Sequence, residues 1–157
     1  MGRNWWLCLA DKMRVVVQRV KKASLFVEEN YKGEIGKGVV VLAGFKKNDG
    51  EKEIRYIVDK IYNLRIFEDE NGKMNYSIEK IKGEIMVVSQ FTLYGDVSHS
   101  SRPDFTKAEE FSKAKNLFEM FVDEMKKKGA KLLCGEFGKK MLVEIHNDGP
   151  VTIIIEK

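Results

Sequence analysis

Three polar side chains follow one strongly apolar stretch of this sequence. Residues 85–88 are all apolar, and Ser89, Gln90 and Thr92 come after them, with Phe91 in between. An unbroken apolar run of this kind predicts a strand that is buried on both faces. A buried polar group without a partner costs about 1–3 kcal/mol, so these groups are either hydrogen-bonded or exposed at the mouth of a site. Taken alone, the stretch is more typical of a strand end that runs into a loop.

The two hydroxyl groups of this stretch could attack an ester carbonyl if a base lay beside them. Neither Ser89 nor Thr92 has a histidine next to it in the sequence, and no Ser-His-Asp arrangement is recognisable. The members of a triad often come from distant positions, so the sequence leaves this chemistry open.

A second stretch, residues 147–152, contains the pair Gly149 and Pro150. Its residues are turn formers and predict a simple turn between two strands. A bond before proline is cis in only about 5–6% of cases in folded proteins. Three further positions look ordinary from sequence alone. Arg19 is typical of an exposed strand arginine, and Phe137 and Met141 are typical of the apolar core.

The composition is that of a globular protein. The chain has 157 residues, of which 43% are hydrophobic and 33% charged, and it has only two prolines. This length predicts one domain that can bury a core without disulfides. The net charge of +4 is compatible with an anionic partner but does not by itself indicate nucleic acid.

Cysteine and histidine are few and scattered. Cys8 and Cys134 are the only cysteines, and His99 and His146 are far apart in the sequence. A disulfide framework and a zinc site are therefore not expected, which suits a reducing compartment. We expect no metal and no cofactor, and no apolar run approaches transmembrane length.

Residues 1–12 stand apart from the rest of the chain. Their apolar segment is too short for a signal peptide, and no small-residue cleavage pattern follows it. We expect residues 1–12 to be an N-terminal extension, either disordered or added upstream of the natural start, and residues 13–157 to form a single domain.

Two helices interrupt a series of predicted strands. Apolar residues recur at helical spacing in residues 51–64, which predicts an amphipathic helix. A capping box at Thr106 and Glu109 predicts the start of a second helix, which ends at Gly129. Its expected buried stripe is Ala108, Phe111, Leu117, Phe118, Phe121, Val122 and Met125. The predicted strands are residues 13–20, 23–27, 38–45, 65–67, 84–90, 130–134, 141–146 and 151–156, with a turn at residues 30–33. This order predicts an α+β domain with a mixed sheet and both helices packed on one side.

Together the two polar stretches resemble the D-aminoacyl-tRNA deacylase (D-tyrosyl-tRNA deacylase) family. The resemblance is carried by residues 89–93 and 147–152 and extends from Met13 to the C-terminus. Further matching segments are residues 13–20, 65–67, 72–74, 102–105 and 137–138, together with Met141. It implies a curved, barrel-like mixed sheet in a homodimer, and a cytoplasmic enzyme without a cofactor.

The resemblance implies hydrolysis of the ester that joins a D-amino acid to the 3′-terminal ribose of tRNA. This is a proofreading step, so the expected partner is the 3′ end of aminoacyl-tRNA, with no membrane and no DNA partner. Glycine mischarged on tRNA is a second expected substrate, because it has no side chain to reject. Two alternatives stay open: a non-catalytic module that binds tRNA ends, and a Ser/Thr esterase that acts on small molecules.

The resemblance also implies which residues would act in catalysis. Ser89, Gln90, Phe91 and Thr92 would form the catalytic segment. We expect main-chain N–H groups around Phe91 and Thr92 to form the oxyanion hole, while the ribose 2′-hydroxyl helps to activate water. A nucleophilic Thr92 is the second-ranked mechanism.

The remaining expected roles concern substrate selection. By resemblance, Gly149 and Pro150 would be joined by a cis bond and would enter the partner subunit's active site, where they exclude L-side chains. Arg19 would hold this pair in place. Phe137 and Met141 would pack against the terminal adenine.

Overall fold

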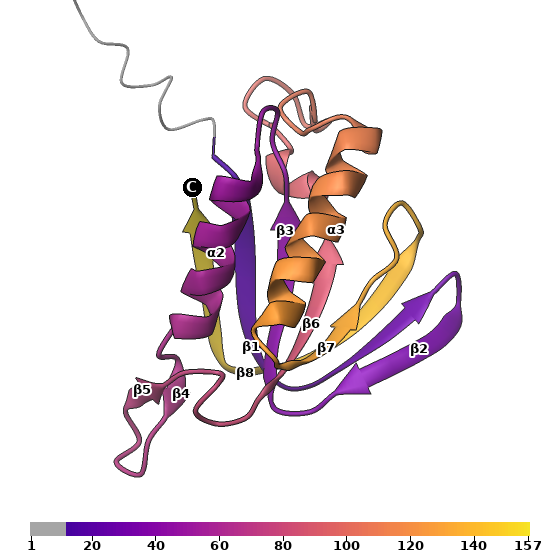
Figure 1. The fold of residues 1–157 in the computed structure, drawn as a ribbon. Helices are drawn as coiled ribbons and strands as arrows, with labels where there is room; N and C mark the ends of the chain where they lie inside the picture. Colours follow the sequence, from indigo (N-terminus) through magenta and orange to yellow (C-terminus); the bar gives the residue numbers. More distant parts are fainter. Residues whose placement is uncertain (1–11) are drawn as a thin grey trace, which may run out of the picture.

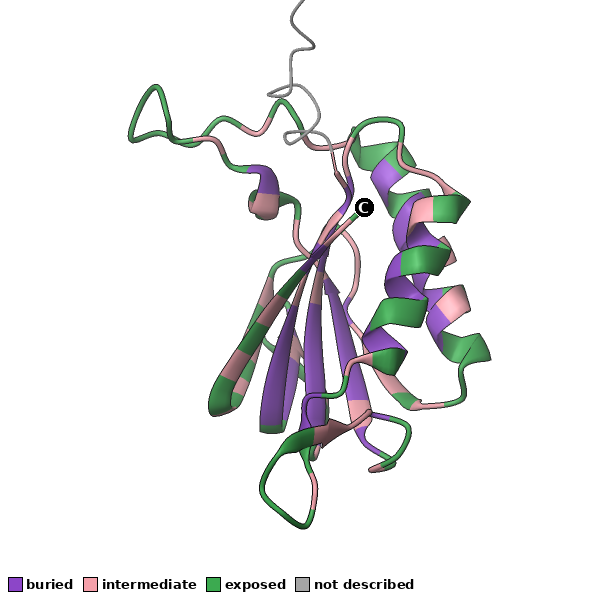
Figure 2. Ribbon diagram, turned by 90° about the vertical axis from the view of Figure 1, so that its left-hand side faces the viewer, coloured by how far each residue is buried: buried purple, intermediate pink, exposed green. Residues whose placement is uncertain are grey.

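Two helices cover one face of a strongly curved mixed sheet (Figure 1). The computed structural model describes residues 12–157. Its elements are β1 (Arg14–Val27), β2 (Asn30–Ile35), β3 (Gly38–Gly44), α2 (Glu51–Asn63), β4 (Phe67–Glu68), β5 (Met74–Tyr76), β6 (Glu84–Ser89), the 3-10 turn η1 (Phe91–Tyr94), α3 (Phe111–Lys127), β7 (Lys131–Cys134) and β8 (Met141–Glu156). The predicted α+β class and the placement of both helices on one side are confirmed (Figure 2).

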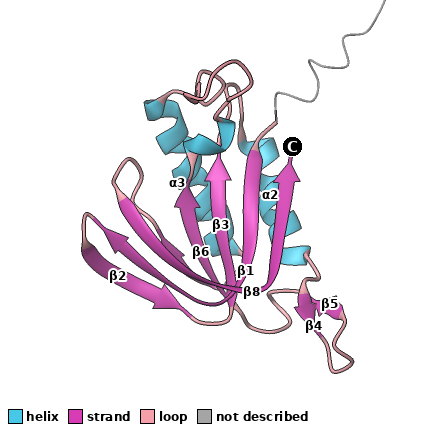
Figure 3. Ribbon diagram, turned by 180° about the vertical axis from the view of Figure 1, so that it is seen from behind, coloured by secondary structure: helices cyan, strands magenta, loops and turns pink. Residues whose placement is uncertain are grey.

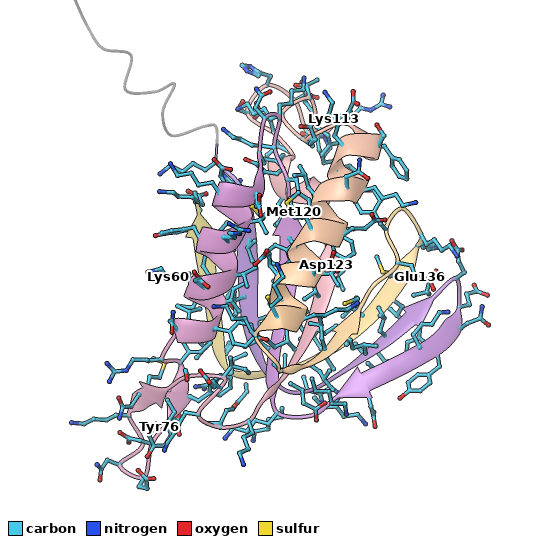
Figure 4. All side chains as sticks on the ribbon, in the orientation of Figure 1. Lys60, Tyr76, Lys113, Met120, Asp123 and Glu136 are labelled. Atoms are coloured by element: carbon cyan, nitrogen blue, oxygen red, sulfur yellow. The ribbon has the colours of Figure 1, made fainter. Side chains whose placement is uncertain are left out.

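The sheet runs in the order β2-β1-β3-β6-β7. Strand β8 lies outside this order and pairs with β1. Strands β3, β6 and β7 are parallel, whereas β1 is antiparallel to its neighbours. Strong curvature brings β2 toward β7 (Figure 3). The Lys32 ammonium on β2 lies 3.1 Å from the Glu136 carboxylate, which follows β7 (Figure 4). The sheet is therefore nearly closed, as the expected barrel-like shape requires.

Strand β6 is buried on both faces, as its apolar run predicts. Ile85 and Val87 belong to the core between the sheet and the helices, together with Ile57 and Phe121. Met86 and the other alternate residues of β6 face a second cluster inside the curved sheet. Because side chains alternate along a strand, one short strand contributes to both cores.

Several predicted strand boundaries are wrong. The segments predicted as 13–20 and 23–27 form one strand, β1, and those predicted as 141–146 and 151–156 form one strand, β8. Each long strand is stabilised by the other, since β1 pairs with β8 along most of its length. The predicted turn at residues 30–33 lies instead at Glu28 and Glu29, which both adopt positive φ. The short strand predicted at residues 65–67 lies at Phe67–Glu68.

The predicted start of the second helix is also wrong. Helix α3 begins at Phe111, with Glu110 as its N-cap residue, so Thr106 and Glu109 form no capping box. The Glu109 amide donates instead to the Phe45 carbonyl at 2.9 Å. This tertiary hydrogen bond keeps the preceding segment out of the helix, and Phe111 is 65% exposed rather than part of the buried stripe.

Apart from Lys12, the extension predicted for residues 1–12 lies outside the described residues. The carbonyl of Lys12 accepts a hydrogen bond from the Tyr94 hydroxyl at 2.8 Å. Within residues 12–157, no helix is long and apolar enough to cross a bilayer.

Candidate active site at the end of strand β6

Strand β6 passes directly into the 3-10 turn η1 at the top of the sheet (Figure 1). The main-chain amide of Gln90 donates to the Ala43 carbonyl on β3 at 2.8 Å. The Leu93 amide then donates to the main-chain carbonyl of Gln90 at 3.3 Å. The amides of Phe91 and Thr92 are the first of the turn and have no carbonyl partner within it. Two adjacent N–H groups of this kind suit an anion or a developing oxyanion.

Buried contacts hold the turn in place. The Tyr94 hydroxyl accepts from the Arg14 amide at 2.9 Å and lies 3.2 Å from the Gly44 carbonyl. Burial raises the pKa of this phenol, which therefore stays protonated. The Arg14 guanidinium donates to the Leu93 carbonyl at 2.9 Å and to the Glu156 carboxylate at 2.7 Å. The first and last strands thus both support η1.

A cavity of about 430 Å³ lies beside the turn. Its lining residues are Ala43, Phe45, Val88, Ser89, Gln90, Phe91, Glu109, Phe111, Ala114, Phe137, Gly138, Lys139, Lys140, Met141 and Val143. The cavity therefore brings together five of the nine residues singled out in the sequence: Ser89, Gln90, Phe91, Phe137 and Met141. The sequence places these five on two distant segments, and the parallel pairing of β6 and β7 explains why they meet.

Thr92 lies beside the cavity rather than in its lining. It is exposed, and its hydroxyl accepts a hydrogen bond from the Gln90 side-chain amide. The Phe91 ring is 58% exposed and packs edge-on against Phe105 at 5.1 Å. Among residues 12–157, no histidine and no cysteine line the cavity, and burial raises the pKa of the Cys134 thiol.

Arg19, Gly149 and Pro150 meet at a different place. The Gly149–Pro150 bond is cis, and Gly149 has φ +117°. Arg19 is 5% exposed and donates to the Asp148 carbonyl at 3.1 Å and to the Ile66 carbonyl at 2.7 Å. A side chain at position 149 would lie 2.9 Å from the Arg19 guanidinium. Arg19 is therefore a buried anchor of this segment rather than an exposed strand residue.

This segment is far from the cavity of its own chain. Arg19 pairs with Val39, which pairs with Ile85, and Ser89 is four residues further along β6. At about 3.3 Å per residue that is roughly 13 Å along the sheet, and at the level of Gly149 β1 and β3 lie between β8 and β6. Neither Gly149 nor Pro150 lines the cavity. Both are exposed where the pairing of β8 with β1 is interrupted.

The sequence analysis missed two features of the site. Phe111 was assigned to the buried stripe, and Glu109 to a helix cap, yet both line the cavity. The Glu109 carboxylate accepts from the main-chain amides of Asn48 at 3.2 Å and Glu110 at 2.9 Å. No signal in the sequence separates these positions from ordinary helix residues, because both depend on where α3 begins.

Asp49 is a buried acid in the β3–α2 loop. One of its carboxylate oxygens accepts from the Lys46 amide at 2.7 Å, and the other is buried without a hydrogen-bond donor among the described residues. Burial raises the pKa of Asp49 to about 6, although the Lys46 amide acts in the opposite direction. Asp49 does not line the cavity, so we assign it to stability rather than to chemistry.

The chain is similar to known proteins over nearly its whole length. The family model described as D-Tyr-tRNA(Tyr) deacylase matches residues 16–156. A protein of Clostridium beijerinckii named D-aminoacyl-tRNA deacylase is 53% identical over 144 residues, which cover 92% of this chain and 97% of that protein. One of the same name from Aquifex aeolicus is 54% identical with the same coverage.

Solved structures agree with the fold. A structure titled c-Myc DNA Unwinding Element Binding Protein superposes with a TM-score of 0.87 at 41% identity, covering 92% of this chain and 99% of that one. A structure titled as a probable eukaryotic D-amino acid tRNA deacylase has a TM-score of 0.79 at 18% identity, covering 93% of this chain and all of that one. At this identity the second likeness shows the fold alone.

Proposed function

The chain belongs to the D-Tyr-tRNA(Tyr) deacylase family of hydrolases, and from this premise we propose that it hydrolyses the ester bond of D-aminoacyl-tRNA. The observation that carries the proposal is the 3-10 turn at the cavity, whose first two main-chain amides, those of Phe91 and Thr92, have no carbonyl partner within the turn. An ester carbonyl needs this kind of donor pair when it becomes tetrahedral. Aminoacyl-tRNA is used in the cytoplasm, and we propose that location for the enzyme.

In the proposed reaction, water attacks the ester carbonyl carbon and a negative charge develops on its oxygen. The Phe91 and Thr92 amides donate to that oxygen. A single oxyanion donor contributes roughly 10²–10³ in rate. The bond to the ribose 3′-oxygen then breaks, the leaving oxygen gains the proton that water loses, and the products are the free amino acid and tRNA.

The substrate supplies a hydroxyl that the protein does not need to provide. The 2′-hydroxyl of the terminal ribose is next to the ester and can help to activate the attacking water. No histidine and no cysteine of the described part of the chain line the cavity, which supports this over a nucleophilic triad. The Thr92 hydroxyl is engaged by Gln90, which supports a binding role for Thr92. Phe137 and Met141 line the cavity and pack, in this proposal, against the terminal adenine.

Gly149 and Pro150 act in the proposal as the chiral filter of a second copy of the chain. Their distance from the cavity of their own chain supports action on a partner, and β8 carries exposed apolar side chains that a partner could cover, Leu142 (59% exposed) and Ile154 (64%). We therefore propose a homodimer. The backbone at Gly149, anchored by Arg19, cannot rotate away from an L-side chain, whereas hydrophobic fit alone is worth only about 1–3 kcal/mol. Glycine has no side chain and would pass the filter.

Parallel assays of D-aminoacyl-, L-aminoacyl- and glycyl-tRNA test the proposal. We expect rapid hydrolysis of the D-ester and the glycyl ester, and L-ester hydrolysis at the uncatalysed rate. Binding of tRNA without turnover would favour a non-catalytic tRNA-binding module. Equal hydrolysis of small D- and L-amino acid esters, with no preference for tRNA, would favour a small-molecule esterase. Either outcome would overturn the proposal.

A further inference from the structure

Phe111 is an exposed aromatic residue at the mouth of the cavity. It is the first residue of α3 and is 65% exposed. Its ring lies 5.1 Å from the ring of Phe137, at an interplanar angle of 60°. A side chain at Gly138, which has φ +81°, would lie 2.7 Å from the tip of the Phe111 ring. The ring thus packs against the glycine backbone on one side and leaves much of its surface open.

The two phenylalanines differ in how far they are embedded. Phe137 is partly buried and also lies 5.9 Å from Phe118, a residue of the main core. Phe111 belongs to neither core cluster. Full burial of a phenylalanine side chain contributes about 1.5–3 kcal/mol, which Phe111 forgoes in large part. Because Phe111 lines the cavity, a ligand that extends out of the cavity can pack against this open surface.

We infer that Phe111 is a stacking surface for the nucleobase that precedes the terminal adenosine of tRNA. The inference rests on the proposed function, because it takes the reacting ester to lie at η1 and the terminal adenine to lie at Phe137 and Met141. Phe111 is the most exposed aromatic residue of the lining, at 65% against 58% for Phe91, and in this inference the path of the polynucleotide out of the cavity lies beside it. Base stacking on an aromatic side chain tolerates any base, since every base has a π-face.

The charges around the rim fit a phosphate between these two nucleotides. Lys140 lines the cavity, is exposed and makes no ion pair among the described residues. Lys139 is held by Glu136 at 2.8 Å and is less available. Glu109 is the acidic group of the lining, and its carboxylate is already engaged by the Asn48 and Glu110 amides. Lys113, on α3 near the same end, adds positive charge (Figure 4).

A series of substrates of increasing length tests the inference. Steady-state KM is measured for D-aminoacyl-adenosine, esterified at its 3′-oxygen, and for the same ester on the dinucleotide CpA. In the wild type, the second nucleotide should lower KM about 10-fold, which corresponds to about 1.4 kcal/mol. In Phe111→Ala the two KM values should differ less than about twofold, because the stacking surface is gone.

Matched variants separate stacking from folding and from general apolarity. Phe111→Trp should keep the gain in KM, because the flat ring is retained, whereas Phe111→Leu should lose it. Tyr31→Ala removes an aromatic residue of similar exposure, 57%, that does not line the cavity, and it should keep the gain. Thermal unfolding of each variant verifies that it is folded.

The outcomes distinguish this inference from the proposed function. A wild type that hydrolyses neither D-ester, nor D-aminoacyl-tRNA, contradicts the proposed function itself. A wild type that hydrolyses them but shows the same KM with one nucleotide as with two overturns only the inference. A Phe111→Ala or Phe111→Leu variant that keeps the 10-fold gain overturns it as well.

Discussion

The chemistry of the proposed site belongs to backbone atoms rather than to side chains. In the proposed mechanism the donors are the amides of Phe91 and Thr92, because the first residues of a 3-10 turn have no carbonyl partner within it. Such a site needs a particular chain conformation and places little demand on side-chain type. The hydroxyl groups of Ser89 and Thr92 attract attention in the sequence, yet the proposed reaction uses neither as a nucleophile.

The Thr92→Ala variant tests this at the level of a single residue. We expect kcat for D-aminoacyl-tRNA to stay within about 10-fold of the wild type, because the Thr92 amide remains. A substrate with a 2′-deoxy terminal ribose should lose about 10²-fold or more, the size of a general acid–base contribution. Thr92→Ser is the matched control. A covalent acyl-enzyme trapped on Thr92 or Ser89 would contradict the mechanism.

Asp49 gives a pH-dependent prediction. Its pKa is about 6 in the folded chain, raised from 3.8 by burial, so the folded state binds its proton more tightly than the unfolded state. This group's contribution to stability is therefore greatest below about pH 4, falls as pH rises from 4 to 6, and stays low above that. Two pKa units correspond to at most about 3 kcal/mol.

We expect Asp49→Asn to remove the loss of stability between about pH 4 and pH 6, because the neutral asparagine side chain buries no charge at any pH. Its oxygen can still accept from the main-chain amide of Lys46. The free energy of unfolding in urea should be higher than that of the wild type at pH 7.5 by roughly 1–3 kcal/mol and equal to it near pH 4. Exposed Asp123, replaced by Asn, is the control (Figure 4). A variant that is less stable than the wild type at pH 7.5 would show that the second carboxylate oxygen has a donor in solution.

At the scale of elements, the turn η1 depends on the first and last strands, β1 and β8, which lie beside it. The Arg14 side chain joins the Leu93 carbonyl to Glu156 of β8, and the Tyr94 hydroxyl joins β1 to β3. A 3-10 turn has few internal hydrogen bonds and is short, so these outside contacts fix the direction of its free amides. Catalysis by preorganised donors should be sensitive to this support.

Replacing Arg14 by Gln should lower kcat about 10-fold with little change in KM, because the amides lose their alignment while the cavity walls remain. That factor is about 1.4 kcal/mol of transition-state stabilisation. Lys22→Gln, which breaks an exposed ion pair between Lys22 of β1 and Glu34 of β2, should leave kcat unchanged. A parallel rise in KM with constant kcat would mean that Arg14 supports substrate binding instead.

The sequence predicts elements well where one local pattern decides them. Helix α2 and strand β6 lie where periodicity and an unbroken apolar run place them. Three features could not be predicted because distant partners decide them. Strand β8 continues through Gly149 and Pro150 because its residues before and after this pair both form hydrogen-bonded pairs with β1. Glu28 and Glu29 turn the first hairpin without glycine or asparagine, and α3 starts late because Glu109 is bonded to Phe45.

The same reasoning applies to the site. The stretches at residues 89–93 and 147–152 could be identified from the sequence. Their separation within one chain could not be predicted. The burial of Arg19 depends on the Ile66 and Asp148 carbonyls, which are distant in sequence. The Phe111 ring lies against the backbone at Gly138, which is also distant in sequence. Contacts of this range leave no local pattern to find.

At the scale of the whole molecule, the separation of the cavity from Gly149 and Pro150 makes the proposed selectivity a property of two chains. In the proposed dimer, one chain supplies the turn at Phe91, and its partner supplies the anchored glycine backbone. Two variants damage these parts separately. Phe91→Pro removes one amide donor, and Phe91 is the first residue of the turn, the position in a helical turn where the missing amide and fixed φ of proline are tolerated. Gly149→Ala with Pro150→Ala changes the filter.

The two variants alone should fail in different ways. Phe91→Pro should lose about 10²-fold or more of its D-aminoacyl-tRNA hydrolysis, as the loss of one oxyanion donor does. The double variant should still hydrolyse the D-ester but should no longer spare the L-ester. The measured quantity is the ratio of the L-ester rate to the D-ester rate.

A mixed dimer of the two variants, isolated with two different affinity tags, then decides where the filter acts. Its one intact turn belongs to the chain with the damaged filter, and its one intact filter belongs to the chain with the damaged turn. If the filter acts on the partner, these intact halves meet in one site, and the mixed dimer should regain a low ratio of L-ester to D-ester rate. If the filter acts within its own chain, the working turn keeps its damaged filter and the ratio stays high. A fully active, selective monomer in light scattering would rule out a site built from two chains.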